Sequence, residues 1–135
     1  QPAFDLLWGG NSGLYSERLG DRYKIMNRFQ SLSRQGISIC SSSDWYVTDM
    51  NIAMSLYALI HHHNPQEKLE PIEAIKSYTE NNSWLNHTED SLGKIEEGYI
   101  ADLSVMDTDF TKLFDWNKVR TLLIIKDGNI VYDDR

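Results

Sequence analysis

Three groups of side chains in this sequence could take part in catalysis or metal binding. They are a serine run at 41–43 that leads into Asp44, the single cysteine Cys40, and three consecutive histidines at 61–63. The nucleophile of many serine hydrolases lies in a Gly-x-Ser-x-Gly turn, and no such turn surrounds these serines. We therefore predict that they form hydrogen bonds at the end of a strand. One cysteine excludes an intramolecular disulfide and a four-cysteine zinc site, and Cys40 is predicted to pack as a small apolar residue.

The histidine run is a weaker candidate for a metal site. Consecutive residues at a helix end project about 100° apart, unlike an i, i+4 pair, so His61, His62 and His63 are not expected to converge on one ion. His87 has no partner at metal-ligand spacing and is predicted to lie in a loop. Asp44 alone is typical of a turn after a strand, and Trp45, which follows it, could line a pocket.

The elements that would position these residues alternate between helix and strand. Apolar residues at helical intervals predict a helix in the second half of 15–35, which Gly36 would close in the left-handed conformation. The β-branched run Ile37–Cys40 predicts a strand. Asp49 is predicted to cap an apolar helix that reaches Ile60, and the histidines then end it.

A second helix is expected to begin at Pro71, a residue suited to the first helical position. The residue pattern after this helix predicts strands over 101–106 and 119–125. Asp127-Gly128 predicts a hairpin turn that leads into a return strand over 130–132. The expected class is therefore α/β. An isolated hairpin with one more strand is marginal in water, and the apolar helix needs neighbours that the other residues hardly supply. The pattern suggests a piece of a larger fold.

Composition narrows the function classes. The 135 residues carry 13 basic and 20 acidic side chains, a formal charge of −7, and such a surface repels phosphate backbones, which argues against nucleic-acid binding. No apolar run approaches the roughly 20 residues that span a bilayer, so no membrane partner is expected. The absence of a leader pattern and the single thiol together predict a cytoplasmic protein.

Motifs along practically the whole chain resemble the metal-dependent amidohydrolases of the family-3 type. The matching segments, in order, are Gln1-Pro2-Ala3-Phe4, Arg18-Leu19-Gly20 with Arg22, Gly36-Ile37, Ser43-Asp44 with Val47, Glu73-Ala74 with Tyr78-Thr79, the stretch from Leu92 to Leu103, and the hairpin with Asp127-Gly128. The Gly-x-Ile-Glu-x-Gly-x-x-Ala-Asp-Leu pattern inside the 92–103 stretch is the most specific of these.

This resemblance implies the C-terminal part of a (β/α)8 barrel over residues 1–90 and part of an accessory β-sandwich over 91–135. It also implies that Asp44 ends the eighth strand, where it ligates a divalent metal, zinc being the expected ion, and accepts a proton from the attacking water. The implied substrate is a small molecule with an amide-type C–N bond. The other metal ligands would lie upstream, so the segment alone is expected to be inactive.

Two departures and one alternative accompany this interpretation. The family pattern is usually Gly-Ser-Asp-x-Pro-Val, and here Ser42 replaces the glycine and Tyr46 the proline, which leaves the shape of the adjoining loop open. The alternative is a free-standing, non-catalytic α/β module that self-associates. In either case exposed strand edges and apolar surface predict a homo-oligomer.

Overall fold

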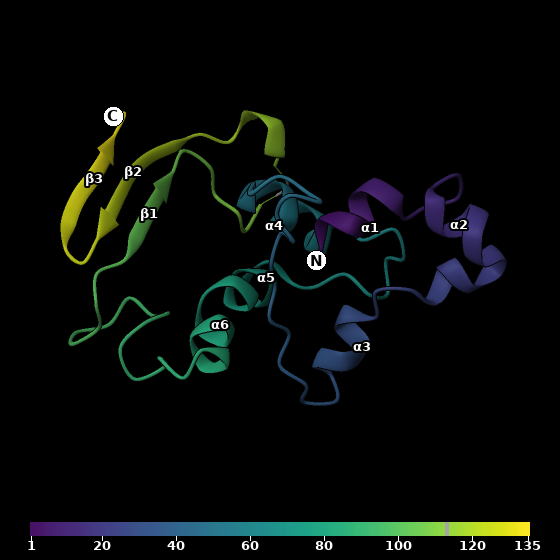
Figure 1. Ribbon diagram of the computed structural model, residues 1–135, viewed down its shortest axis with the longest axis horizontal. Helices are drawn as coiled ribbons and strands as arrows, with labels where there is room; N and C mark the ends of the chain where they lie inside the picture. The colour runs from purple at the N-terminus through teal and green to yellow at the C-terminus, as the bar shows by residue number, and fades with distance from the viewer. Residues whose placement is uncertain (113) are drawn as a thin grey trace.

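The computed structural model describes residues 1–112 and 114–135 and has an elongated shape (Figure 1). A three-stranded sheet lies at one end, short helices lie at the other, and the N-terminus lies between them. Within the described residues, every helix is too short or too polar to cross a lipid bilayer.

The first third of the chain forms a series of short helices. These are α1 (Ala3–Trp8), α2 (Leu14–Leu19), the 3-10 helix η1 (Gly20–Ile25) and α3 (Phe29–Ser33). The predicted helix in the second half of 15–35 is confirmed only as α3. Its end is as predicted: Gly36 has φ 78°, and the amides of Gly36 and Ile37 donate to the carbonyls of Ser33 and Leu32, a Schellman arrangement.

The predicted strand at 37–40 is wrong within the described structure. Residues 37–44 have no regular secondary structure, because the only sheet among the described residues is the C-terminal one and no strand lies alongside to pair with them. Side chains and backbone of the later helices supply their hydrogen bonds instead. The segment is therefore held in place by helices rather than by a sheet.

Helix α4 (Ile52–Ile60) is the most buried element of the molecule. Its cap is Asn51, whose Oδ1 accepts a hydrogen bond of 3.0 Å from Met54 N, so the prediction that Asp49 caps it is wrong by two residues. Leu56 and Leu59 lead the hydrophobic core. The remaining buried members of this core are Leu69, Ala74 and Phe114.

Helix α5 (Pro71–Tyr78) begins at the predicted proline, and Glu70 and Glu73 form a capping box around its first turn. Helix α6 (Glu80–Leu85) was not predicted, because its sequence Glu-Asn-Asn-Ser-Trp-Leu lacks an apolar stripe. Both helices pack against each other, and α5 packs on α4.

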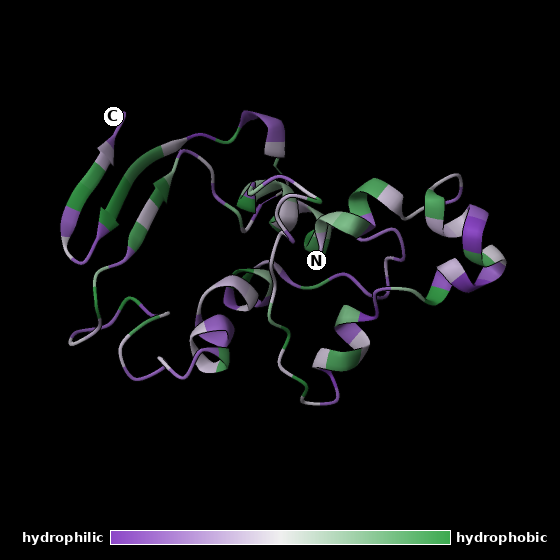
Figure 2. Cartoon of the chain, viewed as in Figure 1, coloured by the Kyte–Doolittle hydropathy of each residue, from purple (hydrophilic) through white to green (hydrophobic). Residues whose placement is uncertain are grey.

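The C-terminal strands confirm the predicted β-rich tail. Strands β1 (Leu103–Met106), β2 (Thr121–Lys126) and β3 (Asn129–Asp133) form an antiparallel sheet in the order β1-β2-β3, and Asp127-Gly128 makes the turn between the last two. A short 3-10 helix, η2 (Trp116–Lys118), precedes β2 and packs on α4. Both β2 and β3 contain runs of apolar residues, drawn in green in Figure 2, yet every residue of β3 is exposed.

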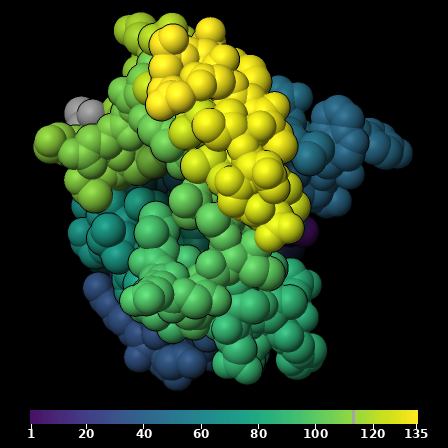
Figure 3. Space-filling model, turned by 90° about the vertical axis from the view of Figure 1, so that its left-hand side faces the viewer, coloured from purple at the N-terminus to yellow at the C-terminus, as the bar shows by residue number. Residues whose placement is uncertain are grey.

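The sheet joins the helices through a close contact at Gly93. This residue has φ 93°, and a Cβ placed on it would lie 2.4 Å from Ser83 Oγ and 3.1 Å from Glu80 Cα. Only glycine fits this approach of the chain to α6. Viewed from the sheet end, the C-terminal hairpin lies over the segment that precedes β1, with α6 below it (Figure 3).

Candidate functional site

Asp44 lies in an exposed turn at the end of the extended segment. Its φ is 57°, a left-handed conformation that aspartate and asparagine adopt more readily than other residues with a Cβ. Its carbonyl accepts a 2.7 Å hydrogen bond from Val47 N, and Thr48 Oγ1 donates to the carbonyl of Ser43. The backbone of the turn is thus bonded on both sides of Asp44, while the carboxylate faces solvent.

Helices α5 and α6 hold the extended segment that leads to this turn. Ser41 N donates to Ser77 O at 2.9 Å. Asn81 Nδ2 donates to Ile39 O at 2.8 Å, and Asn82 Nδ2 donates to Ser41 O at 3.0 Å. Two asparagine amides therefore do here what a neighbouring strand would do in a sheet, and the position of Asp44 follows from them.

Asp44 lies near the amino group of Gln1 and is followed by two exposed aromatic residues. Its charge acts to raise the pKa of the Gln1 amino group, although burial of that group has the larger effect and lowers this pKa. Trp45 is 64% and Tyr46 85% exposed, so the predicted pocket-lining tryptophan lies open to solvent. Among the described residues, the carboxylate of Asp44 has no hydrogen bond or ion pair, and its oxygens are available to a ligand.

The other residues singled out from the sequence lie apart from Asp44 or serve the fold. Cys40 is half-buried, and its thiol donates to Asn81 O at 3.3 Å. Ser41 is 4% exposed and holds the segment through its backbone. Arg18 and Arg22 are exposed on the short helices at the far end.

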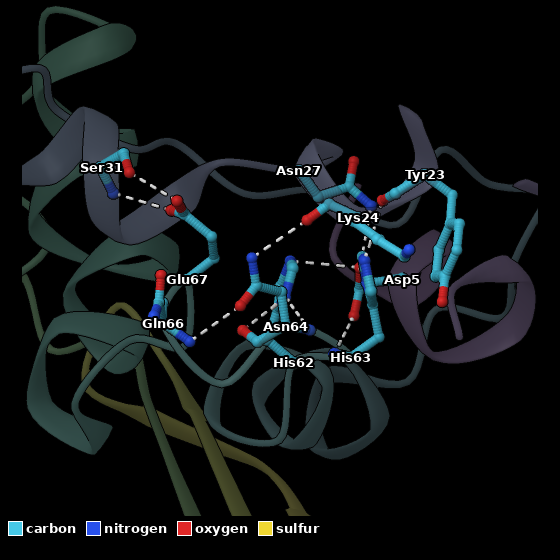
Figure 4. A network of polar contacts seen from close by, with 10 residues as sticks. All are labelled: Asp5, Tyr23, Lys24, Asn27, Ser31, His62, His63, Asn64, Gln66 and Glu67. Atoms are coloured by element: carbon cyan, nitrogen blue, oxygen red, sulfur yellow. Dashed lines mark hydrogen bonds and ion pairs between the residues drawn. The ribbon is translucent and has the colours of Figure 1, made fainter. Parts of the chain in front are cut away.

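The expectation that the histidines do not converge is wrong for two of the three. Helix α4 ends at Ile60, so His62 and His63 lie in the irregular segment after it, where the helical 100° spacing does not apply. Both imidazoles face Asp5 of α1 (Figure 4). His61 turns the other way and stacks on Tyr57 with ring centroids 3.9 Å apart.

Asp5 is 3% exposed and accepts hydrogen bonds from two distant parts of the chain, Asn27 and His63. Its Oδ2 accepts a 2.9 Å hydrogen bond from His63 N, and its Oδ1 accepts one of 3.0 Å from Asn27 Nδ2. His63 Nδ1 lies 2.5 Å from Oδ1 and His63 Nε2 lies 3.0 Å from the carbonyl of Tyr23. Both ring nitrogens of His63 therefore lie beside oxygen acceptors, the carboxylate of Asp5 on one side and the carbonyl of Tyr23 on the other.

His62 is the third member of this cluster, but its Nε2 has no hydrogen-bond partner among the described residues. Its Nδ1 lies 3.1 Å from Asn64 O and 3.0 Å from Asn64 N. Its Nε2 is buried 3.1 Å from Asp5 Oδ1, in a direction that does not make a hydrogen bond. Burial lowers the pKa of His62 and outweighs the opposite effect of Asp5, so this imidazole is neutral.

The same segment continues into a second buried carboxylate. Glu67 is 6% exposed and accepts hydrogen bonds from Ser31 N at 2.9 Å and Ser31 Oγ at 2.5 Å. Burial acts to raise its pKa, but these bonds and the charge of Arg28 outweigh burial and lower it. Residues 63–67 of the loop between α4 and α5 are thus joined to residues 23–31 by several hydrogen bonds (Figure 4).

Sequence reasoning missed Asp5 as a partner of the histidines. The signal was present: Asp5 is the only charged residue in the apolar helix Ala-Phe-Asp-Leu-Leu-Trp. A charged side chain on such a helix is normally paired when buried. Asp5 and His63 are 58 positions apart in the sequence, so no local pattern indicated which group would pair with Asp5.

The chain belongs to the Amidohydrolase family, whose model matches residues 1–132. A relative of known sequence is the putative amidohydrolase YtcJ of Bacillus subtilis (strain 168), which is 33% identical over 104 residues. That match covers 69% of this chain and 20% of the relative. The resemblance inferred from the sequence motifs is therefore confirmed, and nothing in these matches supports the alternative of a free-standing module.

A solved structure gives the same result for the fold. The amidohydrolase from Thermotoga maritima MSB8 superposes on this chain with a TM-score of 0.66, over 80% of this chain and 26% of that one, at 21% identity. The chain thus spans about a fifth to a quarter of the length of these relatives. The α/β class and a hydrolase affiliation follow from these matches.

Proposed function

We propose that these residues form the C-terminal part of a metal-dependent amidohydrolase, with residues 1–90 completing a (β/α)8 barrel and residues 91–135 contributing to a β-sandwich. The support is the family match over 132 residues, together with the lack of a strand that pairs with residues 37–44 in the part of the chain that the structure describes. An extended segment held by residues of α5 and α6, with no strand beside it among the described residues, is what a barrel strand would become without its neighbours. The exposed sheet edge of β3 fits the same explanation.

Asp44 is the proposed catalytic residue. Its carboxylate is exposed and unpaired among the described residues, at the end of the segment that would be the last barrel strand, and barrel enzymes place their active sites at strand ends. One carboxylate does not hold an ion alone, so the other ligands would come from outside these 135 residues. Oxygen ligands of this kind suit a divalent ion such as zinc.

A bound divalent ion would supply a water molecule whose pKa is lowered toward about 7. With that ion bound, Asp44 would accept a proton from the water as the water oxygen attacks the carbonyl carbon of a small amide. The same carboxyl group returns the proton to the leaving nitrogen as the C–N bond breaks. The hydrogen bonds from Val47 and Thr48 hold the backbone of the turn from which the Asp44 side chain projects.

The test uses the full-length gene product, assayed against a panel of small amides with and without added zinc. Asp44→Asn retains the left-handed turn and is expected to lower kcat by about 100-fold or more. Asp49→Asn is the matched control, an exposed aspartate five residues further on, and is expected to keep normal activity. Full activity of Asp44→Asn would refute the assignment.

The 135-residue chain alone is expected to hydrolyse none of these amides, because it lacks the remaining ligands. Self-association of this chain through its exposed apolar surface also stays a prediction, which sedimentation would check. Turnover by the isolated chain would contradict the proposal that the active site is shared with residues outside it.

A further inference from the structure

We infer that Asp5, His62 and His63 form a second metal site, structural rather than catalytic, that binds one divalent ion of the zinc class. One ligand atom from each residue lies within 4.8 Å of the other two, and this is the one such group of three among residues 1–112 and 114–135. Asp44 does not belong to it. The site is thus independent of the proposed active site.

The first argument is the unsatisfied nitrogen of His62. The side chain of His62 is fully buried, and Nε2 points at Asp5 Oδ1 from 3.1 Å without forming a hydrogen bond. A buried polar atom without a partner costs free energy. A cation between Nε2 and the carboxylate would satisfy both atoms at once.

The second argument is what the far side of each imidazole contacts. His63 Nε2 faces the carbonyl of Tyr23 at 3.0 Å, and His62 Nδ1 faces the carbonyl of Asn64 at 3.1 Å. Metal-bound histidines almost always donate their other ring hydrogen to a carbonyl or carboxylate, which fixes the tautomer that leaves a lone pair for the metal. His63 has this arrangement already, whereas His62 Nδ1 also accepts a hydrogen bond from Asn64 N and would have to bond to the Asn64 carbonyl instead when Nε2 binds the ion.

The third argument is the geometry of the ligand atoms. Zinc bonds of about 2.0–2.2 Å place two tetrahedral ligands roughly 3.4 Å apart. The separation of His62 Nε2 from Asp5 Oδ1 is 3.1 Å, close to this value. His63 Nδ1 lies 2.5 Å from Oδ1, so the ion takes the place of the shared hydrogen and this pair widens. Asn27, whose amide already contacts Oδ1, offers a carbonyl oxygen as a fourth ligand when the amide is turned.

Two imidazoles and one carboxylate in a buried setting favour zinc over magnesium or calcium, which prefer oxygen ligands throughout. The ion would join α1 to the loop after α4, across 58 residues of sequence. Its effect would be on stability, because the side chains of Asp5, His62 and His63 are almost fully buried.

The experiment is a zinc titration of the 135-residue chain after removal of metal with a chelator. We expect one zinc per chain and a rise in Tm of roughly 10 °C when zinc is at a hundredfold excess over its Kd. Cobalt in place of zinc should give the visible absorption of a four-coordinate site. Absence of binding, or more than one ion without a change in Tm, would overturn the inference.

Single variants separate this site from other histidines and from Asp44. His62→Gln and His63→Gln should weaken zinc binding by at least about 100-fold. His61→Gln is the matched control within the same run, because its ring stacks on Tyr57, and it should bind zinc normally. Asp44→Asn should also bind normally, whereas loss of binding in either of these two variants would contradict the assignment.

If His62→Gln or His63→Gln does not fold, X-ray absorption of the zinc-loaded parent chain decides the question. Two imidazoles with one or two oxygen ligands support the site, and any other ligand set refutes it.

Discussion

Replacing Asp5 with alanine is the most direct test of the cluster of Asp5, His62 and His63, which joins α1 to the loop after α4. The change removes the acceptor of hydrogen bonds from His63 N, His63 Nδ1 and Asn27 Nδ2. It leaves a buried backbone N–H without a partner, which costs about 1–3 kcal/mol. It also removes the carboxylate from its buried contact with the His63 ring, and breaking a buried pair from one side costs about 3–5 kcal/mol in total.

The assay is urea unfolding followed by far-UV circular dichroism, in buffer with chelator so that the metal-free chain is measured. Asp5→Ala should lower the free energy of unfolding by about 3–5 kcal/mol. Asp5→Asn keeps the shape and one acceptor oxygen, so it should cost less. Combining Asp5→Asn with His63→Gln in a double-mutant cycle should give a coupling of about 0.5–3 kcal/mol.

Asp21→Ala is the matched control, because Asp21 pairs with Lys24 at 2.7 Å but its side chain is 92% exposed. Solvent screens such a pair, and no measurable change in stability is expected. A free energy of unfolding of Asp5→Ala within about 0.5 kcal/mol of the parent value would refute this reasoning. Removing a buried acceptor of three hydrogen bonds should destabilise the chain by more than that.

Two further changes test the core and the acid limit of the fold. Leu59→Ala, at a side chain with 0% exposure, should lower the free energy of unfolding by about 2–5 kcal/mol, while Leu85→Ala, 56% exposed, should cost far less in the same urea assay. The lowered pKa of Glu67 means that its contribution to stability is complete above its unfolded value of 4.5 and is lost as pH falls through the folded value. Unfolding measured from pH 7 to pH 3 should show this loss, and Ser31→Ala should reduce it; an unchanged pH profile in Ser31→Ala would contradict the role given to those hydrogen bonds.

Much of the tail was predictable because its signals are local. Asp127-Gly128 and the apolar runs on either side specify a hairpin within ten residues, and Pro71 marks a helix start by itself. The run Ile37–Cys40 is different, since a strand exists only when another strand pairs with it. Its sequence favours extension, and extension is what the structure has, but the partner is not among the described residues.

The candidate site divides in the same way. The place of Asp44 at the end of an extended segment follows from its sequence context and from the family resemblance, whereas its role is not a local property. The pairing of Asp5 with His62 and His63 depends on two segments 58 residues apart meeting, which spacing rules for one helix cannot describe. Long-range pairing of buried charges was therefore the part that sequence reasoning could not supply.

Gly93 is the residue at which the chain that leads to the sheet passes close to α6. The sheet reaches the helices through a chain that passes so near Ser83 that a single added carbon has no room. A side chain at this point would push the chain away from α6. Phe114 and η2 attach the chain between β1 and β2 to α4, so a substitution at Gly93 would strain the sheet between two fixed attachments.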